Sequence, residues 1–159
     1  MRCVFCAQEL QTGHAPRRVE GALAETARLL RERTRQALPA PELAFYGGTF
    51  TALPAEAFAA ALELARTALR QGFISGLRCS TRPDSLPPDR LAALREAGCG
   101  CVELGVQSFA DAPLRESRRG YDGRTAREAC AAVQAAGMRA GVQLMPGMPG
   151  SPPEHFLAD

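Results

Sequence analysis

Leu43-Ala44-Phe45-Tyr46-Gly47-Gly48-Thr49 is a short apolar run that stops at two consecutive glycines. A run of this length followed by glycine is typical of a buried β-strand that leads into a loop. Helical patterns lie on both sides of it, at 19–38 and 54–70. The stretch therefore predicts a strand between two helices, the repeating unit of parallel α/β folds.

The same alternation continues along the chain. Strands are expected at 76–81, 102–106 and 139–145, and helices at 87–97, 111–118 and 125–136. The strand cores are apolar on both faces, as a parallel sheet covered by helices requires. Residues 2–16 are interpreted as a loop, and a further helix is expected from Pro153 onward. The predicted fold class is α/β.

Length and composition describe one domain with few electrostatic clues. The chain has 159 residues and a formal net charge of +2, which favours neither a nucleic acid nor a membrane surface as a partner. No apolar run is long enough to span a bilayer, and no signal-peptide pattern is present. A cytoplasmic location is therefore expected. Thiols stay reduced there, so the six cysteines are expected to be ligands or packing groups.

Polar or glycine-rich residues mark the carboxyl end of every predicted strand, at 47–49, 80–82, 107–108 and 143–150. Parallel α/β folds bind ligands at this edge of the sheet, so the four ends together predict one site. Gly47 and Gly48 would let the backbone approach a ligand, or would simply form a tight turn. Gln107 and Gln143 each need a hydrogen-bond partner, and a ligand hydroxyl and a loop backbone group are equally open.

Two cysteines, Cys3 and Cys6, lie two residues apart near the start of the chain. Such a pair occurs in zinc sites, redox loops and iron–sulfur clusters. Cys99 and Cys101 could complete a zinc site, but they precede a strand and so belong at the opposite edge of the sheet. A thioredoxin-like role is weaker still, because a polar loop follows Cys6. Cys79 and Cys130 are expected to be buried packing groups.

Five stretches occur in order along the chain: Arg-Cys-Val-Phe-Cys at 2–6, Ala-Phe-Tyr-Gly-Gly-Thr-Phe-Thr at 44–51, Arg-Cys-Ser-Thr-Arg-Pro-Asp at 78–84, Glu-Leu-Gly-Val-Gln-Ser at 103–108 and Gln-Leu-Met-Pro-Gly-Met-Pro-Gly at 143–150. Together they resemble the radical S-adenosylmethionine (SAM) enzymes. The most similar branch includes the catalytic subunit of Elongator and its short bacterial relatives without an acetyltransferase domain. The resemblance covers essentially the whole chain.

The resemblance implies a partial (βα)6 barrel of the TIM type, of which residues 1–159 would be a core fragment truncated at both ends. The fragment would run from the cluster loop through the fifth strand, without the first and sixth strands. In this family a Cys-x-x-x-Cys-x-x-Cys motif holds a [4Fe–4S] cluster whose open iron binds SAM. One electron then cleaves the sulfur–C5′ bond and gives a 5′-deoxyadenosyl radical. The implied partners are an electron donor, such as flavodoxin or ferredoxin, and tRNA, with no membrane.

Motif positions also imply a role for individual residues, although none is implied as a catalytic residue. Cys3 and Cys6 would ligate the cluster, and the first cysteine of the motif would fall two residues before Met1. The remaining residues would contact SAM. The adenine would lie beside Phe5 and be bordered by Gly147 to Gly150, and the amino group would be received by Gly47, Gly48 and Thr49. The sugar or methionine side would be contacted by Ser80, Gln107 and Gln143, and the carboxylate by Arg119.

Other features and alternatives complete these expectations. Tyr121 stands where relatives commonly carry His after Arg-Gly, and Glu103 is expected to pair with an Arg inside the barrel. One alternative is a relative of oxygen-independent coproporphyrinogen oxidase, which shares the glycine, Gln107 and Arg119 motifs. Another is a catalytically incompetent module that binds through the adenine rim without a stable cluster.

Overall fold

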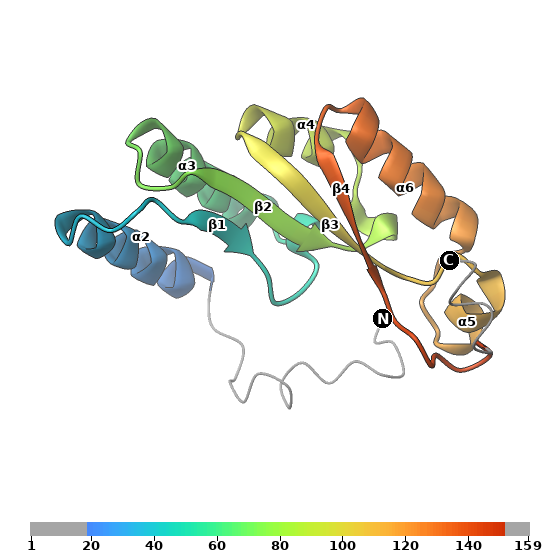
Figure 1. Cartoon of the computed structure of the whole chain (residues 1–159). Coiled ribbons are helices and arrows are strands. Elements are labelled where there is room, and N and C mark those ends of the chain that lie inside the picture. Colours follow the sequence, from blue (N-terminus) through green and yellow to red (C-terminus); the bar gives the residue numbers. More distant parts are fainter. Residues whose placement is uncertain (1–18, 152–159) are drawn as a thin grey trace.

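A computed structural model describes residues 19–151, which form four parallel strands in a single sheet (Figure 1). Each strand pairs in parallel with the next one along the chain, so the order is β1-β2-β3-β4. The strands are β1 (Glu42–Phe45), β2 (Gly76–Thr81), β3 (Cys99–Gln107) and β4 (Arg139–Leu144). The α/β fold with a parallel sheet is confirmed. Cys3, Phe5, Cys6 and the helix expected from Pro153 lie outside the described residues.

Helices connect the strands, as the alternating pattern predicts. The α-helices are α2 (Val19–Arg35), α3 (Ala55–Arg70), α4 (Pro88–Glu96), α5 (Asp111–Glu116) and α6 (Gly123–Ala135), and the 3-10 helices are η1 (Phe50–Ala52) and η2 (Pro83–Ser85). Glycines in the left-handed region follow α3, α4 and α6, which is a common way to end a helix. None of the described helices is long and apolar enough to cross a membrane.

One face of the sheet is covered by α3, α4 and α6 and holds the hydrophobic core (Figure 1). Alternate strand residues point to this face, so Leu77, Val102 and Leu104 are buried against Leu62 of α3 and Val133 of α6. Full burial of such a side chain contributes about 1.5–3 kcal/mol. The opposite face, here called the inner face, carries the residues in between: Arg78, Ser80, Glu103, Gly105 and Gln143.

The structure differs from the expected boundaries at β3 and α6. β3 begins at Cys99 rather than at 102, because Cys99 pairs with Leu77 and Cys101 pairs with Arg139. The two cysteines therefore belong to the amino end of β3 instead of preceding the strand. Cys99 packs in the helix-covered core. α6 begins two residues earlier than expected, where the Asp122 carboxylate accepts a hydrogen bond from the backbone of Thr125.

Candidate functional site

The carboxyl ends of all four strands lie along the same edge of the sheet, because every pairing is parallel. This edge collects the residues that the strand ends predict as a site. Gly47, Gly48 and Thr49 follow β1, Ser80 is the penultimate residue of β2, Gln107 ends β3, Gln143 is the penultimate residue of β4, and Gly147 and Gly150 follow β4. Arg119 joins them from the loop between α5 and α6.

The turn after β1 leaves its backbone open to approach. Gly47 has a φ of 100°, which favours glycine strongly. A Cβ atom built at Gly47 or Gly48 would have no other atom within 4 Å. Thr49 starts η1 with an extended backbone, and its side chain makes no capping hydrogen bond. A ligand could therefore approach this turn without displacing a neighbouring side chain.

Gln107 adopts a backbone conformation that is rare outside glycine, with a φ of 72°. The register between β3 and β4 shifts between Leu104 and Gln107, and the Gln107 carbonyl accepts a 2.9 Å hydrogen bond from the Met145 backbone. A backbone of this kind costs about 1–3 kcal/mol, and such residues cluster at functional sites. Gln107 thus ends β3 with a sharp change of direction.

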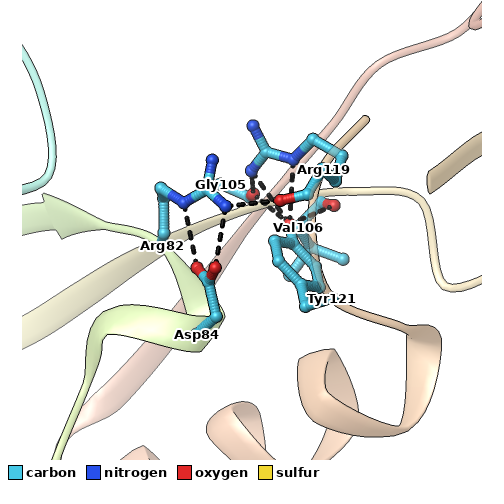
Figure 2. Close-up of polar contacts among 6 residues, drawn as sticks. All are labelled: Arg82, Asp84, Gly105, Val106, Arg119 and Tyr121. Carbon is cyan, nitrogen blue, oxygen red and sulfur yellow. Dashed lines mark hydrogen bonds and ion pairs between the residues drawn. The ribbon is translucent and has the colours of Figure 1, made fainter. Parts of the chain in front are cut away.

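Tyr121 and Arg119 hold the end of β3 in place (Figure 2). The Tyr121 hydroxyl is 2.9 Å from both the Gly105 and the Val106 carbonyl oxygens. Arg119 is only 6% exposed, and its Nη2 donates to the Gly105 carbonyl and to the Tyr121 hydroxyl. Burial raises the pKa of Tyr121, so its hydroxyl stays protonated and able to donate at neutral pH.

Arg82 links this cluster to the end of β2. Its guanidinium makes a two-point contact with the Asp84 carboxylate, at 2.9 and 2.8 Å, and donates to the backbone carbonyl of Arg119 (Figure 2). The guanidinium carbons of Arg82 and Arg119 lie 5.5 and 5.2 Å from the centre of the Tyr121 ring. Such cation–π contacts add to the hydrogen bonds. The ends of β2 and β3 are therefore tied together by side chains.

Glu103 is the centre of a second network, which lies on the inner face. Its Oε1 accepts hydrogen bonds from the Tyr46 hydroxyl at 2.6 Å and from Arg78 Nη1 at 2.9 Å, while its Oε2 accepts one from Gln143 Nε2 at 3.1 Å. Arg78 also pairs with Glu42, with 2.8 Å between Nε and Oε2. The hydrogen bond from Tyr46, followed by those from Gln143 and Arg78, lowers the pKa of Glu103.

The sequence predicted part of this arrangement. The pairing of Glu103 with an Arg is confirmed, since Arg78 is its partner. The Gln143 amide nitrogen binds the Glu103 side chain, a partner that was not expected, and its contact with a ligand hydroxyl stays a prediction. Tyr46, Arg82 and Asp84 were not predicted as network members. Their only signal was their position at strand ends.

The remaining cysteines provide no metal site among residues 19–151, where no group of three His, Cys, Asp or Glu residues could hold a metal ion. Cys79 is fully buried, as expected, whereas Cys130 is only partly buried. A hydrogen bond with Cys99, together with burial, raises the pKa of the Cys79 thiol. This thiol is therefore a protonated packing group, not a nucleophile.

Known proteins match the whole chain at the level of a superfamily. The Radical SAM superfamily matches residues 1–159. A tRNA uridine(34) acetyltransferase of Dehalococcoides mccartyi (strain CBDB1) is 35% identical over 83 residues, which are 52% of this chain and 18% of that protein. The chain thus spans less than a fifth of the length of this curated relative.

Two solved structures share the fold. The archaeal Methanocaldococcus infernus Elp3 with an N-terminal deletion superposes with a TM-score of 0.69 and 25% identity, over 84% of this chain and 36% of that one. Coproporphyrinogen III oxidase (HemN) from Escherichia coli superposes with a TM-score of 0.70 and 21% identity, over 98% of this chain and 37% of that one. The second likeness concerns the fold alone.

Proposed function

This chain belongs to the radical SAM superfamily, and we propose that it carries the part of such an enzyme that binds S-adenosylmethionine beside a [4Fe–4S] cluster. The observation that carries the proposal is the shared edge of four parallel strands, where glycine-rich and polar ends lie in the order of the motifs. Cys3 and Cys6 would supply thiolates to the cluster, and thiolates are its preferred ligands.

The described residues fit the organic cofactor at several points along this edge. The turn at Gly47 and Gly48 leaves backbone open for the amino group. Ser80, Gln107 and Gln143 offer polar side chains for the sugar or methionine side, and Arg119 contributes positive charge for the carboxylate. We also assign Thr49 to the amino group, and Phe5, Gly147 and Gly150 to the adenine.

When bound, the cluster and SAM would supply a 5′-deoxyadenosyl radical after one-electron reduction, which requires a donor such as flavodoxin or ferredoxin. The residues of this chain would bind the nucleoside, orient it and exclude water from it. The substrate we propose is tRNA, which is supported by the name of the relative that is 35% identical over 83 residues. Porphyrinogen has less support as a substrate, because this chain is only 21% identical to coproporphyrinogen III oxidase and shares its fold alone.

The test is anaerobic reconstitution with iron and sulfide, made on the chain and on a version extended at its amino terminus to supply a cysteine four residues before Cys3. The extended protein is expected to show the visible absorbance of a [4Fe–4S] cluster and, with dithionite, to convert SAM to 5′-deoxyadenosine. Cys3→Ser and Cys6→Ser should each abolish both signals, whereas Cys130→Ser should keep them.

The proposal fails if the extended protein holds no cluster and forms no 5′-deoxyadenosine. A cluster in the extended protein alone would make the 159-residue chain an incompetent binding module. Substrate class is tested separately, by comparing 5′-deoxyadenosine formation in the presence of tRNA and of coproporphyrinogen. Stimulation by the porphyrinogen alone would replace tRNA as the proposed substrate.

A further inference from the structure

The inner face of the sheet joins groups from all four strands at Glu103. Tyr46 directly follows β1, Arg78 lies on β2, Glu103 on β3 and Gln143 on β4. The Glu103 side chain is 16% exposed, so it is covered better than its partner Arg78, at 30%. Tyr46 is 56% exposed, and Gln143 is also exposed. The network thus presents accessible polar groups around one nearly buried carboxylate.

The chemistry of this carboxylate determines which way the Gln143 amide faces. An ionised carboxylate only accepts hydrogen bonds, so the amide must turn its Nε2 toward Glu103 and its Oε1 away. The reversed amide would bring two acceptor oxygens together. Tyr46 and Arg78 hold the carboxylate at its other oxygen, which leaves Oε2 for the amide.

The backbone of β4 is adapted to this contact. Gly141 lies directly opposite Glu103, and a Cβ atom at Gly141 would lie 2.9 Å from Glu103 Cγ. A Cβ atom at that separation would force Glu103 to shift. The absence of a side chain at Gly141 therefore lets the Glu103 side chain lie over the β4 backbone and reach Gln143, two residues nearer the carboxyl edge.

We propose that Glu103 is a positioning residue, which turns the Gln143 amide so that Oε1 accepts a hydrogen bond from a ribose hydroxyl of the bound nucleoside. The inference rests on the proposed function, which puts S-adenosylmethionine at this edge. It goes beyond that function because it fixes the orientation of the Gln143 amide and requires the ribose hydroxyl to act as the hydrogen-bond donor. A merely structural Glu103 would join the strands and leave ligand selection unchanged.

The positioning role of Glu103 is tested by combining two changes in the ligand, removal of the 2′- or of the 3′-hydroxyl, with one change in the protein, Glu103→Gln. The probes are 5′-deoxyadenosine and its 2′- and 3′-deoxy derivatives, whose binding requires no iron, measured by equilibrium dialysis on the full chain. For the wild type, removal of one of the two hydroxyls is expected to weaken binding about fivefold. In Glu103→Gln the residue can both donate and accept, so the Gln143 amide loses its fixed orientation. The same removal should then cost less than about twofold.

Glu42→Gln is the matched control. It makes the same substitution on the same face and in a partner of the same Arg78, but the structure shows no contact between Glu42 and Gln143. This variant should keep the full dependence on the hydroxyl. If wild type and Glu103→Gln depend equally on the hydroxyl, Glu103 is structural and the inference is overturned. If the wild type binds none of the probes while the extended protein forms 5′-deoxyadenosine, the inference is overturned and the proposed function stands.

Nuclear magnetic resonance tests the orientation without any ligand. The two side-chain amide protons of Gln143, assigned with Gln143→Met, should resonate away from the positions of a free glutamine in the wild type and in Glu42→Gln, because one of them is hydrogen-bonded to Glu103. Resonances at the positions of a free glutamine in the wild type would overturn the inference even if Glu103→Gln did not fold. A fixed amide in the wild type would support it independently of binding.

Discussion

The hydroxyl of Tyr121 compensates for an interruption in the sheet. The ladder between β3 and β4 shifts register between Leu104 and Gln107. Within that interval Gly105 and Val106 each direct a carbonyl to Tyr121, and Arg119 adds a second donor to Gly105. Buried carbonyls need such partners. The sequence marked Tyr121 only as a departure from its relatives, since the partners of a hydroxyl depend on where the strand bends.

Tyr121→Phe should lower the free energy of unfolding by about 1–3 kcal/mol, because it removes the donor but keeps the ring beside Arg119. Urea denaturation followed by circular dichroism measures the change. Tyr46→Phe is the matched control, since it also removes a hydrogen-bonded hydroxyl and keeps the ring, but Tyr46 is 56% exposed. Equal losses in both variants would contradict a special role for Tyr121 at the end of β3.

Glu103 predicts a pH dependence whose sign follows from its environment. Its pKa is lowered by the hydrogen bond from Tyr46, so the folded state favours the ionised form. The contribution of Glu103 to the free energy of unfolding is fully present above the pKa of Glu in the unfolded chain, about 4.3. It is lost as the pH falls through the lower pKa of Glu103 in the folded protein. The free-energy difference between wild type and Glu103→Gln should be constant from pH 7 to about 5 and shrink below about 4. Urea denaturation of both proteins at each pH measures this difference. A difference that grew in acid would contradict a lowered pKa for Glu103.

At the scale of elements, apolar runs and glycines were sufficient to predict the α-helices and strands of residues 19–151, but not the 3-10 helices η1 and η2. The start of β3 was missed, because Cys99-Gly100-Cys101 carries a central glycine and no apolar alternation of its own. Pairing with β2 and β4 makes these residues a strand, and pairing is a tertiary effect. The partner of Gln143 was missed for a similar reason. It depends on the register that puts Glu103 opposite Gly141.

That register gives a test at β4. Gly141→Ala would place a Cβ atom 2.9 Å from Glu103 Cγ, so Glu103 must move and lose Gln143. The free energy of unfolding should fall by about 1–3 kcal/mol, which is the usual cost of inserting an extra methyl group into a well-packed site. Thermal denaturation measures the loss. Gly76→Ala is the control on β2, where the new Cβ would meet Glu42 Oε1 at an ordinary 3.5 Å. A similar loss in both variants would show that strand glycines matter only through backbone flexibility.

At the scale of the whole molecule, the two edges of the sheet differ in what they can bind. Parallel pairing collects the four carboxyl ends at one edge, and helices cover one face with the apolar core. The location of the candidate site could therefore be predicted from the order of strands alone. Its side-chain contacts could not, because Arg119 and Gln143 found their partners within the protein, through a bend in β3 and a gap on β4.

This asymmetry predicts where a bound nucleoside should slow hydrogen exchange. S-adenosylmethionine at a concentration of ten times its dissociation constant should slow hydrogen exchange about tenfold at the amides that it covers when bound. Peptides spanning 46–51, 106–109 and 143–150 should be protected, whereas the turns at the amino edge, at 71–75 and 136–138, should exchange as before. Mass spectrometry measures both sets in one sample, so the amino-edge peptides are an internal control. Protection confined to the amino edge would place the ligand on the wrong side of the sheet and remove the basis for assigning Gly47, Gln107 and Gln143 to it.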